Sequence, residues 1–214
     1  MSRIVVFGAA GKAGSRIVAE AAARGHQVTA VARNLDALTD LPERVPAVAG
    51  DATDPHTVAA LAKDADVLVL TVGGPDPSLY TDAVAAAAAA VRALGPAGPR
   101  IIHMGGGASL LRDDGVRFFD APGFPAEFKP YAIGQIRALD TYLALDESVT
   151  WTYLSPPPVH FAPGERTGHY RTGLDHPVAG EDGQARISYE DYATALVDEI
   201  DTPRHLNRRF TVGY

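Results

Sequence analysis

Three glycines near the start of the chain have a spacing that could hold a phosphate group. Residues 8–14 read Gly-Ala-Ala-Gly-Lys-Ala-Gly and follow a short apolar run, Ile4–Phe7. Gly8 would allow a tight turn, Gly11 would let the backbone approach a pyrophosphate, and Gly14 would let a helix pack closely on the strand. The first N–H groups of such a helix attract anions, as does the positive end of its dipole. The expected contacts with the paired phosphates of a dinucleotide are made by Gly8, Ala10, Gly11, Lys12, Ala13 and Gly14, with a solvent-facing position as an equal alternative for Lys12.

The residue at the end of the second apolar run indicates which nucleotide binds. A carboxylate about 20 residues after the glycines would bind the ribose 2′-hydroxyl of NAD(H). The segment at this place reads Val-Ala-Arg-Asn and contains no carboxylate. A guanidinium suits a phosphate by its charge and by its planar set of donors. We therefore expect Arg33 and Asn34 to lie at the 2′-phosphate of NADP(H). NAD(H) stays open as the second cofactor, and an ordinary surface arginine is the alternative interpretation of Arg33.

Small and acidic residues follow the later apolar runs. Asp51 could accept a hydrogen bond from an adenine amino group, with Ala52 beneath the ring; a helix cap ahead of Pro55 is the alternative. Ligands of α/β folds bind at the carboxyl ends of the strands. At the next strand end, room for ribose and phosphates is expected beside Thr71, Val72, Gly73 and Gly74. The nicotinamide is expected beside Met104, Gly105, Pro156 and Pro157.

The elements that would position these residues alternate regularly in the first half. Apolar runs of strand length are 4–7, 28–32, 45–49, 67–72 and 100–103, with helix-like stretches 12–24, 35–41, 55–63 and 80–94 between them. The second half predicts a long loop over 104–128, a helix over 132–145, a strand over 150–154, a further loop over 163–183, a helix from Ser188 to about Ile200 and a strand over 209–212. Continuous apolar strands separated by helices predict an α/β fold with a doubly wound parallel sheet, the Rossmann fold. We expect one domain, residues 1–214, with a small C-terminal annex on the substrate side, formed mainly by 104–130 and 155–187.

Composition excludes several classes of protein. The chain has 214 residues, 46% of them hydrophobic and 21% charged, with a net charge of −7. This acidic balance argues against nucleic acid or an anionic membrane as the main partner. Because there are no cysteines, disulfides, thiolate catalysis and cysteine-ligated metal sites are excluded. No apolar run approaches the roughly 20 residues of a membrane-spanning helix, and no signal-peptide layout is present, so we expect a cytoplasmic protein.

These motifs together resemble the atypical branch of the short-chain dehydrogenase/reductase superfamily. The resemblance rests on the glycine spacing of 8–14, on Arg33, on Gly50-Asp51 and on 72–74. Within that branch the chain is most similar to the NADH-flavin reductase group, which is related to the NmrA-like and biliverdin reductase B groups. Further matching segments are 155–158, 186–193 and 209–213. The resemblance covers nearly the whole chain and implies the fold and a nicotinamide cofactor, but it says much less about the substrate.

The chain departs from the main catalytic pattern of that superfamily. The pattern has a lysine four residues after a tyrosine, whereas Tyr131 is followed four residues later by Gln135, and no other tyrosine has a lysine at that distance. Reduction of a carbonyl needs a positioned acid, whereas a conjugated ring spreads the added charge over its atoms. The candidate catalytic residues are His103, Tyr131 and Gln135. A satisfied, buried histidine at a strand end is the alternative for His103.

We therefore expect an NADPH-dependent reductase that passes a hydride to a small conjugated acceptor, either a flavin (FMN or FAD) or a quinone. Glycines 105–107 would leave room for a flat ring. The alternative is a non-catalytic, NADP(H)-binding redox sensor of the NmrA-like kind. An epimerase is disfavoured, because it also needs the missing pair. No metal-binding spacing is found, and the sequence leaves open whether the protein is a monomer or a homodimer.

Overall fold

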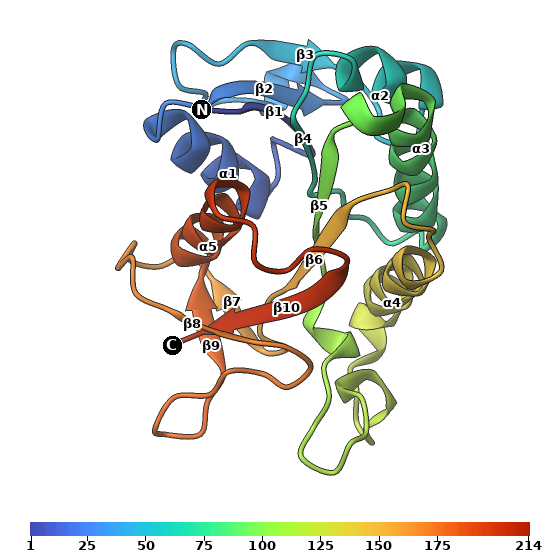
Figure 1. Ribbon diagram of the computed structural model, residues 1–214. Helices are drawn as coiled ribbons and strands as arrows, with labels where there is room; N and C mark the ends of the chain where they lie inside the picture. Colours follow the sequence, from blue (N-terminus) through green and yellow to red (C-terminus); the bar gives the residue numbers. More distant parts are fainter.

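A single eight-stranded sheet forms the centre of the molecule (Figure 1). The computed structural model describes all residues, 1–214. The strands follow one another in the order β3-β2-β1-β4-β5-β6-β10-β8. Each neighbouring pair is parallel except β10 and β8, which are antiparallel. The strands are β1 (Arg3–Phe7), β2 (Gln27–Ala32), β3 (Ala47–Ala49), β4 (Val67–Leu70), β5 (Arg100–Met104), β6 (Trp151–Ser155), β8 (Arg171–Gly173) and β10 (Arg208–Gly213).

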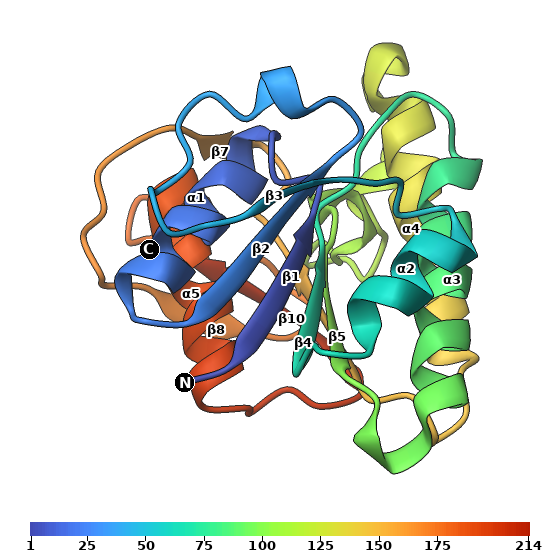
Figure 2. The ribbon, with the colours of Figure 1, turned by 90° about the horizontal axis from the view of Figure 1, so that it is seen from above.

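Helices cover both faces of this sheet, as Figure 2 shows. On one face α1 (Lys12–Ala23) packs beside α5 (Tyr189–Asp201). On the other face lie α2 (Pro55–Ala62), α3 (Ser78–Leu94) and α4 (Lys129–Leu143), packed in that order. Because side chains of a strand alternate between the faces, the buried side chains form two apolar clusters, one under each helical layer. The predicted α/β fold with a doubly wound parallel sheet is confirmed.

The first half of the chain follows the sequence prediction closely, and the second half departs from it. The helix expected over 35–41 is a single 3₁₀ turn, Leu35–Ala37. The loop expected over 163–183 contains β8, and a separate two-stranded ribbon pairs β7 (His160–Ala162) with β9 (Arg186–Ser188). These strands have three residues each and little apolar pattern, so only pairing with a partner strand defines them. Further 3₁₀ turns are Gly95–Ala97, Gly107–Ser109, Phe118–Asp120 and Ala126–Phe128.

The helices differ in how their first turns are capped. The Asp54 side chain accepts hydrogen bonds from the N–H groups of His56 and Thr57 and caps α2, and Ser188 caps α5. By contrast, α1 begins after Gly11 with no side-chain cap and with no acidic residue in its first turn. The first N–H groups of a helix have no partner within the helix, so those of α1 remain free for an external anion. No helix of the chain is both long and apolar enough to cross a membrane.

Candidate functional site

A cavity of about 350 Å³ lies where β1, β2, β3 and β4 end. The loops after β2 and β4 lie at the upper edge of the sheet in Figure 2 and border it. The cavity is therefore at the carboxyl edge of the parallel strands, where open α/β sheets bind ligands. The predicted site residues that line it are Gly8, Ala10, Gly11, Arg33, Asn34, Asp51, Ala52, Thr71, Val72 and Gly73.

The glycine turn forms one wall of this cavity. Gly8 has φ +79°, which favours glycine, and a Cβ there would lie 2.6 Å from the carbonyl oxygen of Thr71. A Cβ on Gly14 would lie 2.2 Å from the carbonyl oxygen of Gly8. At Gly11 the corresponding distance is 3.2 Å, so the turn itself constrains this glycine less. The Thr71 hydroxyl donates to the carbonyl oxygen of Phe7 at 2.7 Å and thereby holds the end of β4 against the turn.

Three of the predicted phosphate contacts lie outside the cavity lining. Ala13 and Gly14 are buried in the first turn of α1. Only their backbone N–H groups could serve an anion. Lys12 is exposed and has no ion pair within the protein, which fits either of the two positions expected for it. The turn therefore offers backbone donors and a free ammonium group to a phosphate.

A free guanidinium stands at the end of β2. Arg33 is exposed and lines the cavity, and it makes no hydrogen bond or ion pair with another residue of the protein. The side chain of its neighbour Asn34 is occupied, because its oxygen accepts a hydrogen bond from the N–H of Asp36 and caps a 3₁₀ turn. Arg33 is thus the cationic side chain of the cavity lining and is available to an anionic ligand.

Asp51 presents one carboxylate oxygen without a partner. Its Oδ1 accepts hydrogen bonds from the N–H and the hydroxyl of Thr53, at 2.9 and 2.8 Å. The alternative role as cap of α2 belongs to Asp54, so Asp51 remains a candidate for an adenine amino group. Sequence reasoning missed other lining residues, and most of them directly precede predicted ones. They are Phe7, Ala32, Ala37, Gly50 and Leu79.

Tyr80 fixes the loop after β4 and was not predicted to do so. Its buried hydroxyl donates to the carbonyl oxygen of Gly74 at 3.0 Å and accepts from the Gly74 N–H at 3.1 Å. Its ring occupies the space beside Gly134 of α4, where a Cβ would lie 2.2 Å from a ring carbon. Gly74 itself does not line the cavity; it holds the segment that contains Val72 and Gly73.

His103 is buried, which contradicts its expected position against the nicotinamide. The side chain is 0% exposed and stacks on Tyr153, with ring centroids 5.1 Å apart. Its Nδ1 lies 3.2 Å from the Tyr142 hydroxyl and its Nε2 lies 3.2 Å from Gln135 Oε1. Because the amide oxygen can only accept, this network places the imidazole proton on Nε2. The alternative interpretation, a satisfied histidine at a strand end, is the one the structure shows.

Gln135 connects α4 to the end of β5. Its Nε2 donates to the carbonyl oxygen of Met104 at 3.1 Å, and its Oε1 accepts from the Tyr153 hydroxyl at 2.8 Å. Tyr131, one helical turn earlier, is 42% exposed. The two candidates therefore differ: Gln135 is held by the protein, and the Tyr131 ring faces solvent.

The glycines after β5 do not provide the open floor that the sequence suggested. A Cβ on Gly105 would lie 2.0 Å from the Tyr153 ring, and one on Gly107 would lie 2.6 Å from Pro158 Cα. These glycines thus admit neighbouring residues of the protein. Pro156 and Pro157 are buried, and the cavity lining contains neither proline, nor Met104, nor Gly105. Their contact with a nicotinamide stays a prediction.

Burial of His103 should make the stability of the fold depend on pH. Burial lowers the pKa of the imidazole from 6.5 to about 4, and the bond to Gln135 opposes this only in part. Between about pH 4 and pH 6.5, His103 is therefore protonated in the unfolded chain but neutral in the folded chain. The contribution of this shift to the free energy of unfolding is fully present above pH 6.5. It should decrease by up to about 3 kcal/mol as the pH drops to 4. Urea unfolding at pH 7 and pH 4.5 measures this change. The His103→Gln variant should lose less stability over the same interval, and equal losses in the two proteins would contradict the assignment.

Comparisons with known proteins identify the family of the chain. The sequence model of a family described as NAD(P)H-binding matches residues 8–203. YwnB of Bacillus subtilis, named an uncharacterized protein, is 37% identical to this chain. The alignment is 223 residues long and covers 98% of this chain and 97% of YwnB. Both proteins therefore share the whole domain.

Two solved structures have the same architecture over the full length. A Burkholderia pseudomallei protein, described as a candidate exported protein, is 37% identical with a TM-score of 0.86 and full coverage of both chains. A Streptococcus pneumoniae protein, described as a candidate NADH-flavin reductase, is 30% identical with a TM-score of 0.82, covering 100% of this chain and 99% of that one. The structure brings together no group of three or more His, Cys, Asp or Glu side chains that could hold a metal ion. The chain belongs to the NAD(P)H-binding family of Rossmann-fold proteins.

Proposed function

We propose that this protein is an NADPH-dependent oxidoreductase that reduces a flavin, a quinone or a similar conjugated acceptor. Membership of the NAD(P)H-binding family supports the nicotinamide cofactor. The cavity fits such a nucleotide because a glycine cradle, an uncapped helix start and the free Arg33 guanidinium border the same space. The relative described as a candidate NADH-flavin reductase supports the class of acceptor.

Preference for NADPH over NADH rests on the position of Arg33. Its guanidinium lies at the end of β2 without a partner and could form paired, charge-assisted hydrogen bonds with a 2′-phosphate. The Asp51 oxygen that has no partner would accept from the adenine amino group, and the first N–H groups of α1 would bind the pyrophosphate. Gly73 and Val72 would border the path of the nicotinamide-side ribose along the ends of the strands.

The observation that carries the choice of acceptor is the neutral network formed by side chains of β5, β6 and α4. Burial lowers the pKa of His103 to about 4 and raises the pKa of Tyr142 and Tyr153 above the ordinary value of a tyrosine. At pH 7 this network holds neutral groups whose protons are committed to internal hydrogen bonds, with Gln135 at its centre. It is suited to fixing the shape of the site rather than to protonating a substrate.

Such a site suits a reaction that needs no positioned acid. The bound dinucleotide would supply a hydride from nicotinamide C4, and the acceptor would take up that hydride and one proton from water. A conjugated ring delocalises the added charge, so orientation by the protein contributes most of the acceleration. The residues of this chain would therefore bind, orient and exclude water.

Anaerobic mixing of the purified protein with NADPH and free flavin tests the proposal. Absorbance of both NADPH and oxidised flavin should fall together, at equimolar rates and faster than in a blank without protein. A quinone should serve as a second acceptor under the same conditions. The alternative function, a redox sensor, has one supporting observation, the glutamine where a catalytic lysine is usual. It predicts tight NADP(H) binding without turnover of any of these acceptors, and that result would overturn the proposed reductase.

A further inference from the structure

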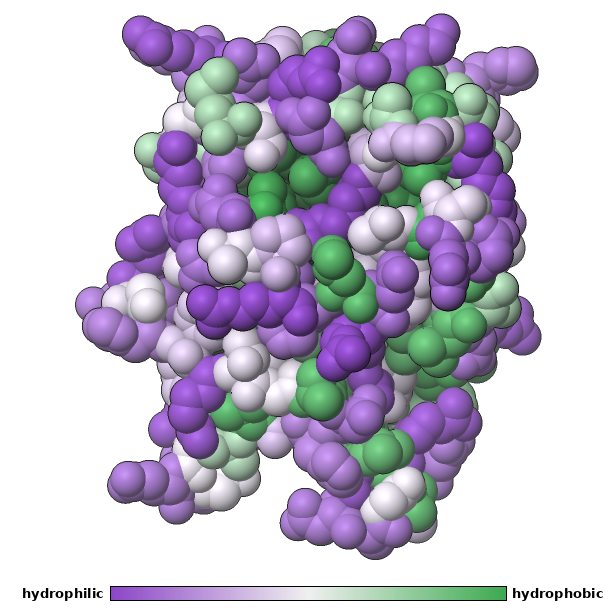
Figure 3. Space-filling model, in the orientation of Figure 1, coloured by the Kyte–Doolittle hydropathy of each residue, from purple (hydrophilic) through white to green (hydrophobic).

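A second hollow, of about 570 Å³, lies between two loops on the substrate side of the molecule. We call it the notch; Figure 3 shows an indentation between two lobes at the lower edge of this view. One wall is formed by Leu111–Asp114 and Phe118, which follow β5, and another by Pro158–His160, which follow β6. The third wall comes from the segment between β8 and β9, through Pro177, Ala179 and 183–185. None of these residues lines the nucleotide cavity.

The order of the strands relates the notch to the cavity. The cavity lies at the ends of β1 to β4, and the sheet continues through β5 and β6 beside β4. Residues that follow β5 and β6 form two walls of the notch, so both hollows open at the carboxyl edge of the same sheet. Pro158 lines the notch and also packs against Gly107, directly after β5. An acceptor in the notch would thus lie on the side toward which a dinucleotide extends.

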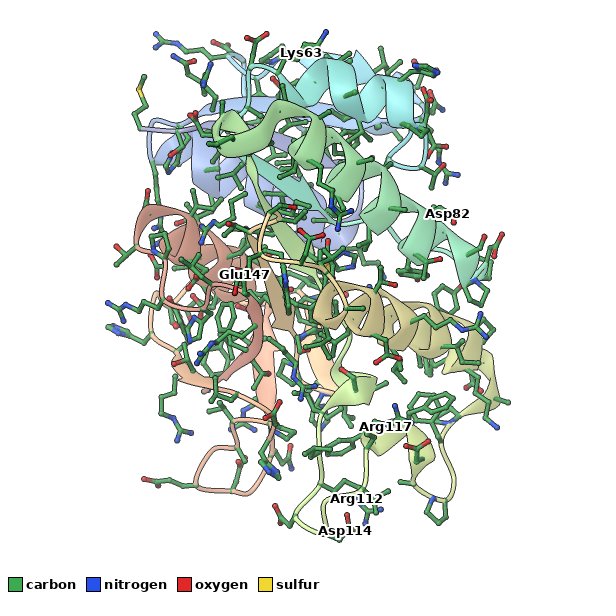
Figure 4. All side chains as sticks on the ribbon, turned by 45° about the vertical axis from the view of Figure 1, so that its right-hand side comes forward. Lys63, Asp82, Arg112, Asp114, Arg117 and Glu147 are labelled. Carbon is green, nitrogen blue, oxygen red and sulfur yellow. The ribbon has the colours of Figure 1, made fainter.

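The walls of the notch combine apolar surface with acidic charge. Val159 is 71% exposed, and Leu111 and Phe118 are partly exposed. A flat aromatic ring could pack against these apolar side chains. Arg112, the only arginine or lysine of the lining, is paired with Asp114 at 3.4 Å, and the adjacent Asp113 has no ion pair; the lining also contains the imidazole of His160. Figure 4 shows Arg112 and Asp114 near the tip of the loop between β5 and α4.

Cations around the notch are occupied as well. Arg117 is paired with Asp120 at 2.6 Å, and Arg186 is paired with Asp182 at 2.8 Å. Arg171 donates to the backbone carbonyl oxygens of residues 179 and 214. The nucleotide cavity differs, because Arg33 is free there. A phosphate bound at the notch would lie near the unpaired carboxylate of Asp113, and no unpaired guanidinium would be available to it.

We propose that the notch binds the hydride acceptor and selects acceptors that carry no phosphate, such as riboflavin or a quinone, over FMN and FAD. This inference rests on the proposed reductase function and narrows its substrate. The apolar walls hold the ring, and the acidic rim repels the charge of about −2 on a phosphate at pH 7. Surface charges interact over distances of about 10 Å at moderate ionic strength, so the selection should depend on salt.

Steady-state rates with riboflavin and with FMN test this selection. At low ionic strength kcat/KM should be on the order of fivefold higher for riboflavin, and the ratio should fall toward one as NaCl screens the carboxylates. Equal values or a preference for FMN at low salt would overturn the inference while leaving the reductase in place. If NADPH is oxidised with none of these acceptors, the proposed function itself fails.

The Asp114→Asn variant provides a second, independent measurement. It releases Arg112 from its ion pair and removes one negative charge, so the ratio of kcat/KM for FMN to that for riboflavin should rise by roughly threefold or more. The matched control is Glu147→Gln, which removes the same charge from the exposed loop between α4 and β6, away from the notch (Figure 4). An unchanged ratio in Asp114→Asn, or an equal rise in Glu147→Gln, would show that the notch does not select the acceptor.

Discussion

Replacing Gly8 with alanine should weaken the binding of NADPH by a factor of about 100 or more. This is the loss of affinity expected when several hydrogen bonds from the turn to an anion are disrupted together. The added Cβ would lie 2.6 Å from the carbonyl oxygen of Thr71, and the φ of +79° is strained for alanine. Thr71 also anchors the turn through its hydroxyl, which donates to the carbonyl oxygen of Phe7. The turn and the end of β4 must therefore move apart, which displaces the backbone donors of the turn from the expected position of the pyrophosphate. Isothermal titration with NADPH measures the loss.

Gly25→Ala is the matched control for this variant. Gly25 also has a positive φ, +83°, but a Cβ there would meet nothing within 4 Å. It lies in the turn after α1, at the opposite end of that helix from the cavity. This variant should lose about 1 kcal/mol of stability from backbone strain and keep its affinity for NADPH. Unchanged affinity for NADPH in Gly8→Ala, or an equal loss of affinity in both variants, would contradict the proposed role of the glycine turn in binding the nucleotide.

Arg33→Ala should change the choice of nucleotide more than the catalytic rate. Charge-assisted hydrogen bonds from an exposed guanidinium to a phosphate contribute about 2 kcal/mol, which corresponds to roughly 30-fold in affinity. Affinity for NADPH should fall by about this factor, whereas affinity for NADH, which has no 2′-phosphate, should change less than about twofold. The NADPH effect should also shrink at high salt, because the site is exposed. Titration with both nucleotides at two ionic strengths gives the comparison.

Arg44→Ala is the control for the loss of a positive charge. Arg44 is exposed and lies between β2 and β3, as Arg33 does, but it does not line the cavity. It should leave the ratio of the two affinities near that of the unmodified protein. Equal losses of NADPH and NADH affinity in Arg33→Ala would remove this arginine from the 2′-phosphate and favour its alternative interpretation as a surface residue.

The sequence predicted most accurately the features that depend on local geometry. A glycine that needs a positive φ, as Gly8 does, leaves its signature in residue type and spacing alone. Buried parallel strands such as β1 and β4 are continuous apolar runs, so the α/β alternation and the sheet could be predicted. Since the strands are parallel, their carboxyl ends share one edge, which brings Gly8, Arg33 and Asp51 to one cavity.

Prediction was least accurate where a residue's environment comes from distant segments. His103 was expected to face the cofactor, but Tyr142 of α4 and Tyr153 of β6 enclose it and complete its hydrogen bonds together with Gln135. The glycines at 105–107 were expected to make an open floor, but Tyr153 and Pro158 fill the space they leave. A strand-end position does not specify which side chains will cover it.

By itself, then, the sequence determined the fold class, the tight glycine turn after β1 and the place of Arg33 at the end of β2, because each follows from backbone conformation or from the spacing of strands and helices. Only the tertiary structure decided that His103 is neutral and buried, that Tyr80 holds the loop after β4, and that the loops after β5, β6 and β8 enclose the notch. Those properties arise from desolvation, from hydrogen bonds and from charges of residues far apart in the chain, and no local pattern records which of these residues will meet.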